Sequence, residues 1–216
     1  MMTELPPKSL TFLLADDHAM IRHGLAMLID DIHPDHQLIH ASDLKNIKLV
    51  LQQDKVDIAI LDASFPDGNC LSILPELRRN NPGLVLLIYS GIDETTHALQ
   101  YINAGANGFL SKLSEDHEVE SALRQLIKEG RYLSAQTQSL LIHSLQNPAL
   151  VNPLSCLTDR ELEVALLYAG GTGNIEIAAQ LNIKQNTVST LKKRVFEKLK
   201  IDNIVQLISL INDYRH

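Results

Sequence analysis

The stretch Val56-Asp57-Ile58-Ala59-Ile60-Leu61-Asp62-Ala63-Ser64-Phe65-Pro66-Asp67-Gly68 carries the strongest structural signal in the chain. Its apolar run, residues 58–61, is rich in β-branched side chains and lies between turn formers, which predicts a buried parallel strand. The run ends at one carboxylate, Asp62, before a loop that contains Pro66 and Gly68. Ligands bind open α/β sheets at the carboxyl ends of the strands. Asp62 is therefore either part of a functional crevice or a simple turn former.

Segments that favour strands alternate with segments that favour helices along the first two thirds of the chain. Further apolar runs predict strands at residues 10–15, 37–41, 84–89 and 108–111. Apolar residues at helical spacing predict helices at residues 19–30, 44–53, 71–80, 93–104 and 115–129. The third of these helices contains Pro75, which a helix tolerates only in its first turn. This alternation predicts a doubly wound, five-stranded parallel sheet with helices on both faces.

Polar side chains follow four of the five predicted strands. Asp16 and Asp17 follow the first strand, Asp62 the third, Ser90 the fourth and Lys112 the fifth. A set of carboxylate oxygens suits Mg²⁺, and this cation together with the lysine would relieve the repulsion among the carboxylates. One aspartate could then act as a nucleophile that accepts a phosphoryl group, while the serine binds a phosphoryl oxygen. Each residue alone could be structural, but their placement on strand ends of one sheet indicates a joint site.

The residues around these strand ends resemble a response-regulator receiver domain over about residues 9–131. The resemblance rests on Asp16-Asp17, on residues 61–68, on Tyr89-Ser90-Gly91 and on residues 105–112. It implies a flavodoxin-like fold and gives the expected first domain of the chain.

The same resemblance implies a role for each side chain at the strand ends. Asp62 would be the phosphoacceptor. Mg²⁺ would be held by Asp16, Asp17, Asp62 and the backbone carbonyl of Ser64. Ser90 would provide the switch hydroxyl and Phe109 the switch aromatic ring. Lys112 would provide the ammonium that pairs with the phosphoryl group. Departures from the usual pattern are Leu113 after the lysine, Cys70 where a glycine is common, and a phenylalanine as the switch ring; none removes a ligand.

Several histidines lie near these segments without an obvious chemical role. His18 follows the acidic pair, and we expect it to support the helix that comes next. His33, His36 and His40 have metal-like spacing, but they fall in a predicted loop and strand that contains a proline. For these three we expect a solvated loop.

Composition and charge indicate a globular protein with two unlike regions. Of 216 residues, 45% are hydrophobic, no run is long enough to span a membrane, and the N-terminus lacks a signal sequence. We therefore expect a soluble, cytoplasmic protein without a membrane partner. Residues 1–154 hold 11 Lys and Arg against 19 Asp and Glu, whereas residues 155–216 hold 8 against 7. This asymmetry predicts two domains with different partners.

The basic region has the pattern of a helix-turn-helix. A capping box, Thr158 with Glu161, opens a helix that ends before Gly170, and helices are predicted at residues 174–181 and 185–199. The last of these has an apolar stripe of Val188, Leu191, Val195 and Leu199. Its other face is either merely solvated or bound to DNA, and the side chains available for DNA are Lys184, Thr187, Ser189, Thr190, Lys192, Lys193, Arg194 and Lys198.

Residues 154–214 resemble the LuxR-type DNA-binding domain. The matching pieces are residues 157–164, residues 174–178, Thr187-Val188-Ser189-Thr190 and residues 193–199. By this resemblance Ser189, Thr190 and Lys193 face bases, while Ile175 stands where a lysine is common. The final predicted helix, residues 204–211, has more apolar surface than one small domain needs to bury. We therefore expect self-association, and a homodimer on paired DNA half-sites.

The two resemblances together indicate a response regulator of the NarL/FixJ type rather than an enzyme. The expected domains are a receiver at 9–131, a helix and linker at 132–154, and a DNA-binding domain at 155–216. A sensor histidine kinase would phosphorylate Asp62 with Mg²⁺, and the protein would then bind promoter DNA, with RNA polymerase as a further candidate partner. One alternative is a DNA-binding regulator with a vestigial receiver. The other, an aspartyl-phosphate phosphohydrolase, is disfavoured because Ser64 stands where such enzymes need a second acid.

Overall fold

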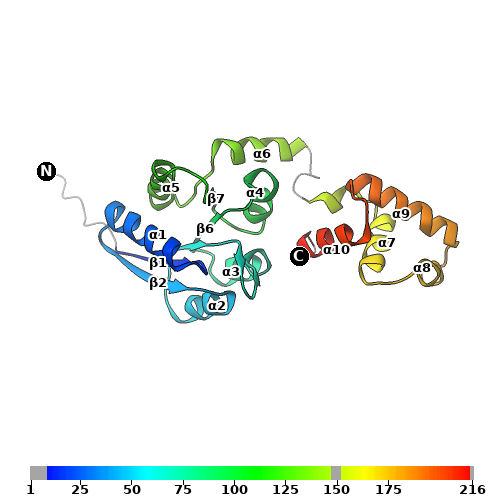
Figure 1. Cartoon of the computed structure of the whole chain (residues 1–216), viewed down its shortest axis with the longest axis horizontal. Coiled ribbons are helices and arrows are strands. Elements are labelled where there is room, and N and C mark those ends of the chain that lie inside the picture. The colour runs from blue at the N-terminus through cyan, green and yellow to red at the C-terminus, as the bar shows by residue number, and fades with distance from the viewer. Residues whose placement is uncertain (1–8, 147–151, 215–216) are drawn as a thin grey trace. The chain divides into compact units, whose positions relative to one another are not determined.

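The computed structural model describes residues 9–146 and 152–214 of the chain (Figure 1). The chain divides into two compact units, residues 1–142 and 143–216, and each is described by itself. Most of the predicted linker, residues 147–154, lies outside the described residues; its last part forms the 3₁₀ turn η3 (Pro153–Cys156). No helix within the described residues has the length and apolar character that a membrane crossing requires.

The first unit is built on a parallel five-stranded sheet, as the alternation of strands and helices predicts. The strands lie in the order β2-β1-β3-β6-β7. They are β1 (Leu10–Ala15), β2 (His36–Ala41), β3 (Ile58–Leu61), β6 (Val85–Ser90) and β7 (Gly108–Ser111). All neighbouring strands are parallel, and Ala15 at the end of β1 pairs with Leu61 at the end of β3. The residues that follow these two strands, Asp16 and Asp62, therefore leave the sheet at the same level.

Helices cover both faces of the sheet, and each face has its own apolar core (Figure 1). Helices α1 (Ala19–Ile32) and α5 (Asp116–Glu129) pack on one face. The other face is covered by α2 (Leu44–Gln53), α3 (Leu74–Asn80) and α4 (Glu94–Asn103). Strands β1, β3, β6 and β7 are largely buried, which explains why they are continuous apolar runs rather than alternating patterns. The edge strand β2 keeps exposed polar residues such as His40.

The segment after β3 differs from its sequence-based prediction. A two-stranded hairpin, β4 (Ser64–Phe65) and β5 (Gly68–Asn69), follows Asp62, and a 3₁₀ turn, η1 (Cys70–Ser72), precedes α3. The helix predicted from residue 71 therefore begins at Leu74, which places Pro75 in its first turn, where a proline is tolerated. Gly68 has a φ of +140°, which strains any residue with a Cβ, so a glycine is required at this turn of the hairpin.

The expectation of a solvated histidine loop is wrong for His36. This residue is the first of β2, and its side chain is 7% exposed. Its ring meets the ring of Phe12 edge-on with centroids 6.1 Å apart, and its Nδ1 lies 2.7 Å from the carbonyl oxygen of His33. His36 is therefore held in place by packing against Phe12. The spacing of the histidines in the sequence could not predict this contact.

The segment that follows α5 stays attached to the sheet before it becomes helix α6 (Ala135–Gln146). Tyr132 forms a parallel bridge with Gly108 on β7, and the Tyr132 carbonyl lies only 2.6 Å from where a Cβ of Gly108 would be. Glu94 on α4 then accepts hydrogen bonds from the hydroxyls of Ser134 and Thr137, the latter at 2.5 Å. Thr137 is fully buried, so the start of α6 belongs to the first unit.

The second unit is entirely helical in its described residues, with α7 (Asp159–Ala169), α8 (Asn174–Gln180), α9 (Gln185–Leu199) and α10 (Ile204–Tyr214). The predicted capping box is present, since Thr158 and Glu161 bond each other's backbone N–H groups. Helices α8 and α9 join through a tight turn in which Asn182 has a positive φ of 51°. In α10, Leu207 and Ile211 are buried in the core of this unit. Much of the apolar surface expected to serve self-association is thus used within the unit, although Val205 stays 71% exposed.

Candidate functional site

Four of the side chains predicted at strand ends lie together at the carboxyl edge of the sheet. Asp16 and Asp62 are 2% and 7% exposed, and Ser90 is 2% exposed. The Lys112 ammonium lies between the two aspartates, with its Nζ 2.6 Å from Asp16 Oδ2 and 2.7 Å from Asp62 Oδ2. The order of the strands explains this, because β1 and β6 both neighbour β3, which ends at Asp62.

The charge of Lys112 is fixed by these two carboxylates. Burial by itself would lower the pKa of the ammonium, but hydrogen bonds and charge from Asp16 and Asp62 outweigh burial and raise this pKa above its ordinary value. The lysine therefore stays charged at neutral pH. It neutralises part of the negative charge that two nearly buried carboxylates would otherwise hold in a medium of low dielectric constant.

Both oxygens of the Asp62 carboxylate are engaged. Oδ2 accepts from Lys112, while Oδ1 accepts from the Ser90 hydroxyl at 2.8 Å and from the Ala63 N–H at 2.6 Å. The thiol of Cys70 is fully buried nearby, and burial followed by the Asp62 charge raises its pKa far above the ordinary range. A neutral thiol at this position adds no charge that would compete with the carboxylate.

Asp17 and His18 complete the group. The His18 Nδ1 lies 2.7 Å from Asp17 Oδ1 and 3.1 Å from Asp16 Oδ1, and the His18 N–H donates to Asp16 Oδ1 at 2.8 Å. His18 is the N-cap residue of α1, and its carbonyl accepts from the N–H groups of Ile21 and Arg22, but its side chain makes no capping bond. Donor atoms of Asp16, Asp17, His18 and Asp62 lie within 4.8 Å of one another. This cluster of acidic residues could bind a metal ion.

Two residues with predicted roles lie outside this contact network. Ser64 is exposed at the start of the hairpin, where it pairs with Asn69. Phe109 is fully buried, and its ring centroid is 5.9 Å from that of Tyr101. The Tyr101 hydroxyl in turn donates to the Asn69 side chain at 2.9 Å. The ring of Phe109 is thus packed in the core and connects, through Tyr101, to the hairpin that follows Asp62.

Sequence reasoning missed Asp67, which ties this hairpin to α2. Its two carboxylate oxygens accept from the N–H groups of Leu44, at 3.0 Å, and Lys45, at 3.2 Å, in the first turn of α2. An Asp-Gly pair is by itself a turn signal, and it fits the loop expected after Asp62. Nothing in the local sequence indicates that the carboxylate serves a helix 23 residues earlier.

A second missed residue, Arg78 on α3, supports the loop that leads to β7. Its guanidinium donates to the carbonyl oxygens of Gly105 and Leu84, at 2.7 and 2.6 Å, and to Asn107 Oδ1 at 2.6 Å. Burial lowers the pKa of Arg78 from its ordinary value. Arginines near the end of a helix, as Arg78 and Arg79 are, usually indicate solvated charges, so the sequence contains no signal for this role.

The predicted DNA-binding face lies on α9 in the second unit. Val188, Val195 and Leu199 are buried, as the apolar stripe predicts. The candidate side chains lie on the rest of the helix surface or at its start; Lys192 is partly buried, and the exposed ones are Lys184, Thr187, Ser189, Thr190, Lys193, Arg194 and Lys198. A basic helix surface next to a helix-turn-helix junction suits the phosphate backbone and the major groove of DNA.

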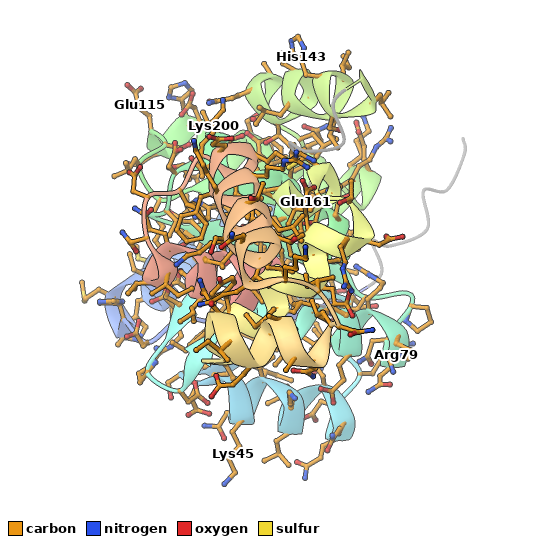
Figure 2. The ribbon with its side chains drawn as sticks, turned by 90° about the vertical axis from the view of Figure 1, so that its right-hand side faces the viewer. Lys45, Arg79, Glu115, His143, Glu161 and Lys200 are labelled. Atoms are coloured by element: carbon orange, nitrogen blue, oxygen red, sulfur yellow. The ribbon has the colours of Figure 1, made fainter. Side chains whose placement is uncertain are left out.

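Two of these lysines are held inside the unit. Lys198 donates to Glu161 Oε2 at 2.6 Å and to the Cys156 carbonyl at 3.1 Å. Glu161, labelled in Figure 2, is 3% exposed, and its hydrogen bonds with Lys198 and then with the Thr158 backbone lower its pKa to about 2. Lys192 Nζ lies over the rings of Tyr168 and Phe196, 4.9 and 5.5 Å from their centroids.

The small polar residues of α9 make hydrogen bonds within the unit, Ser189 with α8 and Thr190 with its own helix. Ser189 Oγ accepts from the Asn174 side chain at 3.2 Å, and Asn174 accepts from the Tyr168 hydroxyl at 2.5 Å. Thr190 donates to the Asn186 carbonyl at 2.9 Å. Within the described residues, Lys184 and Arg194 have no ion-pair partner, so their charges remain available to an anionic ligand.

Comparisons with known proteins match both units. The family described as "Response regulator receiver domain" matches residues 12–124, and "Bacterial regulatory proteins, luxR family" matches residues 155–211. The chain is 28% identical to the response regulator UvrY of Escherichia coli K12 over 92% of this chain and 91% of that protein. It is 30% identical to the response regulator GacA of Pseudomonas aeruginosa over 92% of this chain and 93% of that protein.

Solved structures with a similar fold include RcsB from Salmonella enterica serovar Typhimurium bound to promoter rprA with the phosphomimetic BeF3-. It aligns with a TM-score of 0.68 and 21% identity, over 95% of this chain and 99% of that chain. A second RcsB structure, bound to promoter P1flhDC, gives a TM-score of 0.69 at 21% identity and covers 95% and 98%.

Proposed function

Because this chain belongs to the response regulators that join a receiver domain to a LuxR-type DNA-binding domain, we propose that phosphorylation of Asp62 controls its binding to promoter DNA. Response regulators of this family act in transcription regulation. A sensor histidine kinase would supply the phosphoryl group in the cytoplasm. The observation that carries the proposal is the pair of contacts on Asp62, whose two oxygens bind Ser90 and Lys112.

Asp62 is the best placed of the acidic side chains to accept a phosphoryl group. It follows the central strand β3, and the hydroxyl and ammonium that contact its carboxylate are the groups that a phosphoryl oxygen needs as partners. In the transfer, one Asp62 oxygen forms a bond to phosphorus while the phosphorus–nitrogen bond of a phosphohistidine breaks. The nitrogen keeps the electron pair and then takes a proton.

The acidic group fits Mg²⁺, because hard cations prefer carboxylate and carbonyl oxygens. Asp16, Asp17, Asp62 and the Ser64 carbonyl would hold it, and when bound it would neutralise charge on the transferring phosphoryl group. The side chains of Asp16 and Asp62 need no large movement for this, since their donor atoms already lie within 4.8 Å of those of Asp17.

Phosphorylation would change the partners of Ser90 and Lys112. The new group adds negative charge and three acceptor oxygens, which draw the hydroxyl and the ammonium away from the carboxylate. Ser90 ends β6, and α4 begins four residues later at Glu94, so movement of Ser90 passes to α4. Phe109 would repack in the core as the receiver shifts between its two states.

The output would be DNA binding through α9 by a homodimer on paired half-sites. Ser189, Thr190 and Lys193 would face base edges, and the unpaired cations Lys184 and Arg194 would contact phosphates together with Thr187. Lys192 and Lys198 would contribute less, because rings and Glu161 already hold them. RNA polymerase is a further partner consistent with a promoter-bound regulator.

The test is phosphate incorporation into the full chain from acetyl phosphate with Mg²⁺, followed by intact mass and by affinity for promoter DNA. Asp62→Asn keeps the shape of the side chain, so we expect incorporation and its effect on DNA affinity to disappear. Asp57→Asn is the control, because Asp57 precedes β3 whereas Asp62 follows it. This variant should incorporate phosphate normally. Full incorporation in Asp62→Asn would place the acceptor elsewhere. Incorporation without any change in DNA affinity would instead favour a receiver that does not control binding.

A further inference from the structure

We propose that His18 is a cation ligand, and that its Nδ1 raises the affinity of the acidic group for Mn²⁺ and similar transition metal ions relative to Mg²⁺. This inference rests on the proposed receiver function, in which the same group holds a divalent cation. It adds one nitrogen donor to a set of oxygen donors. It also names a class of cation that the oxygens alone do not select.

The first support is the spacing of the donor atoms. The His18 Nδ1 lies 2.7 Å from Asp17 Oδ1 and 3.1 Å from Asp16 Oδ1. Ligands about 2.1 Å from an octahedrally coordinated ion are separated from their neighbours by about 3 Å. The nitrogen therefore already lies at the separation of an adjacent ligand from each of the two oxygens.

The second support is that the lysine and the histidine use different oxygens of Asp16. Lys112 binds Asp16 Oδ2, whereas His18 faces Asp16 Oδ1. Arg22 donates to the main-chain carbonyl of Asp16 and not to its carboxylate. An ion next to His18 would thus reach Asp16 Oδ1 and Asp17 Oδ1 without displacing the ammonium of Lys112.

The third support is that the ring of His18 makes no capping bond to α1, and that its hydrogen-bond and ion-pair partners in the described residues are Asp16 and Asp17. It occupies the N-cap position of α1 but makes no capping bond, and the side chain is 69% exposed. Its ring contacts are with the two carboxylates alone. A neutral imidazole nitrogen is a good ligand for Mn²⁺, Co²⁺ and Zn²⁺, whereas Mg²⁺ strongly prefers oxygen.

The consequence is a difference in cation selectivity. Removal of the imidazole should weaken Mn²⁺ binding by about tenfold or more, the scale on which metal sites respond to loss of a supporting group. Mg²⁺ affinity should change little, because the carboxylates remain. His18→Gln removes the nitrogen donor and keeps a polar side chain of similar length. His23→Gln, an exposed histidine on the same helix, is the matched control.

The experiment uses the full chain at about pH 8, where an imidazole is neutral. Mn²⁺ affinity is measured from the electron paramagnetic resonance signal of the free ion, and Mg²⁺ affinity from its competition with Mn²⁺. Electron spin-echo spectroscopy of bound Mn²⁺ then shows whether a nitrogen nucleus is directly coordinated. We expect nitrogen coupling in the unaltered protein and in His23→Gln, and its loss, with the weaker Mn²⁺ affinity, in His18→Gln.

Two outcomes overturn the inference and are distinguishable. If Mn²⁺ binds without nitrogen coupling, and Asp17→Asn abolishes this binding, the oxygen site of the proposed function stands and His18 is not a ligand. If Mn²⁺ does not bind, or binds equally well to Asp17→Asn and Asp62→Asn, the cation site itself is absent. That second result contradicts the proposed function as well.

Discussion

The acidic pocket of the first unit and the basic helix of the second assemble their charges in opposite ways. In the pocket, residues separated by up to 96 positions along the chain converge from different strands, and Lys112 neutralises carboxylates that are almost buried. On α9 most of the cations follow one another along a single helix, and only some of them are used inside the unit. The pocket is therefore a set of charges that the fold must balance internally. On the surface of α9, by contrast, the cations that have no internal partner can be balanced by a bound anionic ligand.

The largest effect should follow from Lys112→Met, which leaves Asp16 and Asp62 without their shared cation. Removing one partner of a buried ion pair costs about 3–5 kcal/mol, so we expect a clear fall in the free energy of unfolding of the first unit. Urea denaturation in the presence of a chelator measures it, with Lys128→Met, an exposed lysine, as the control. Added Mg²⁺ should restore part of the loss. Equal denaturation midpoints would show that the pocket does not depend on its lysine.

The next effect concerns Glu161, a buried acid of the second unit that pairs with Lys198. The pKa of Glu161 is about 2, below its ordinary value near 4.5, chiefly through Lys198. Its contribution to stability is therefore complete above about pH 4.5 and is lost as the pH falls toward 2. Thermal unfolding of the full chain between these pH values should show a transition of the second unit that Glu161→Gln makes less sensitive to acid. Glu163→Gln, which removes an exposed acid on the same helix, should keep the original acid sensitivity.

A smaller effect should come from the loop that follows the acceptor. Asp67→Ala removes the acceptors of two N–H groups at the start of α2, a loss of about 1 kcal/mol. We expect a lower midpoint in urea and slower phosphate incorporation, because the hairpin next to Asp62 loses its anchor. Asp67→Asn keeps one acceptor oxygen, so its midpoint in urea and its incorporation rate should lie between those of the unaltered protein and of Asp67→Ala. An unchanged incorporation rate would confine Asp67 to a role in stability.

The smallest effect tests whether the cations of α9 are equivalent. Arg194→Ala removes an unpaired charge, so the logarithm of DNA affinity should depend less steeply on the logarithm of salt concentration, by about one in slope. Lys198→Ala removes a charge that Glu161 already balances, so its slope should stay near that of the unaltered protein. DNA binding at several salt concentrations distinguishes the two. Equal slopes for both variants would mean that Lys198 leaves Glu161 when DNA binds.

The sheet and the convergence at its edge could be predicted because their signals are local. Each strand is an apolar run, and parallel strands bring the residues after them to one edge, so Asp16, Asp62, Ser90 and Lys112 meet without any further information. The hairpin after β3 was not predicted, since strands of two residues have no periodicity to detect.

Contacts made by long polar side chains could not be predicted in the same way. The partners of Arg78 lie up to 29 residues away, and Lys198 pairs with Glu161 across 37 residues. Such pairings depend on how helices pack, and a lysine on a solvated face has the same local sequence as one held by a buried acid. His18 was expected to support the helix that it precedes; its backbone caps that helix, but nothing in the sequence indicates that its ring lies against the acidic pair.

The attachment of α6 to the sheet bears on how the two units could be recombined in chimeric regulators. A junction after residue 131 would remove Tyr132 from the edge of β7 and leave Glu94 without Ser134 and Thr137. The exposed strand edge would then be open to pairing with other chains, which promotes aggregation. A junction after α6, beyond residue 146, keeps these contacts with the receiver. The transferable module is therefore longer than the sheet and its five surrounding helices.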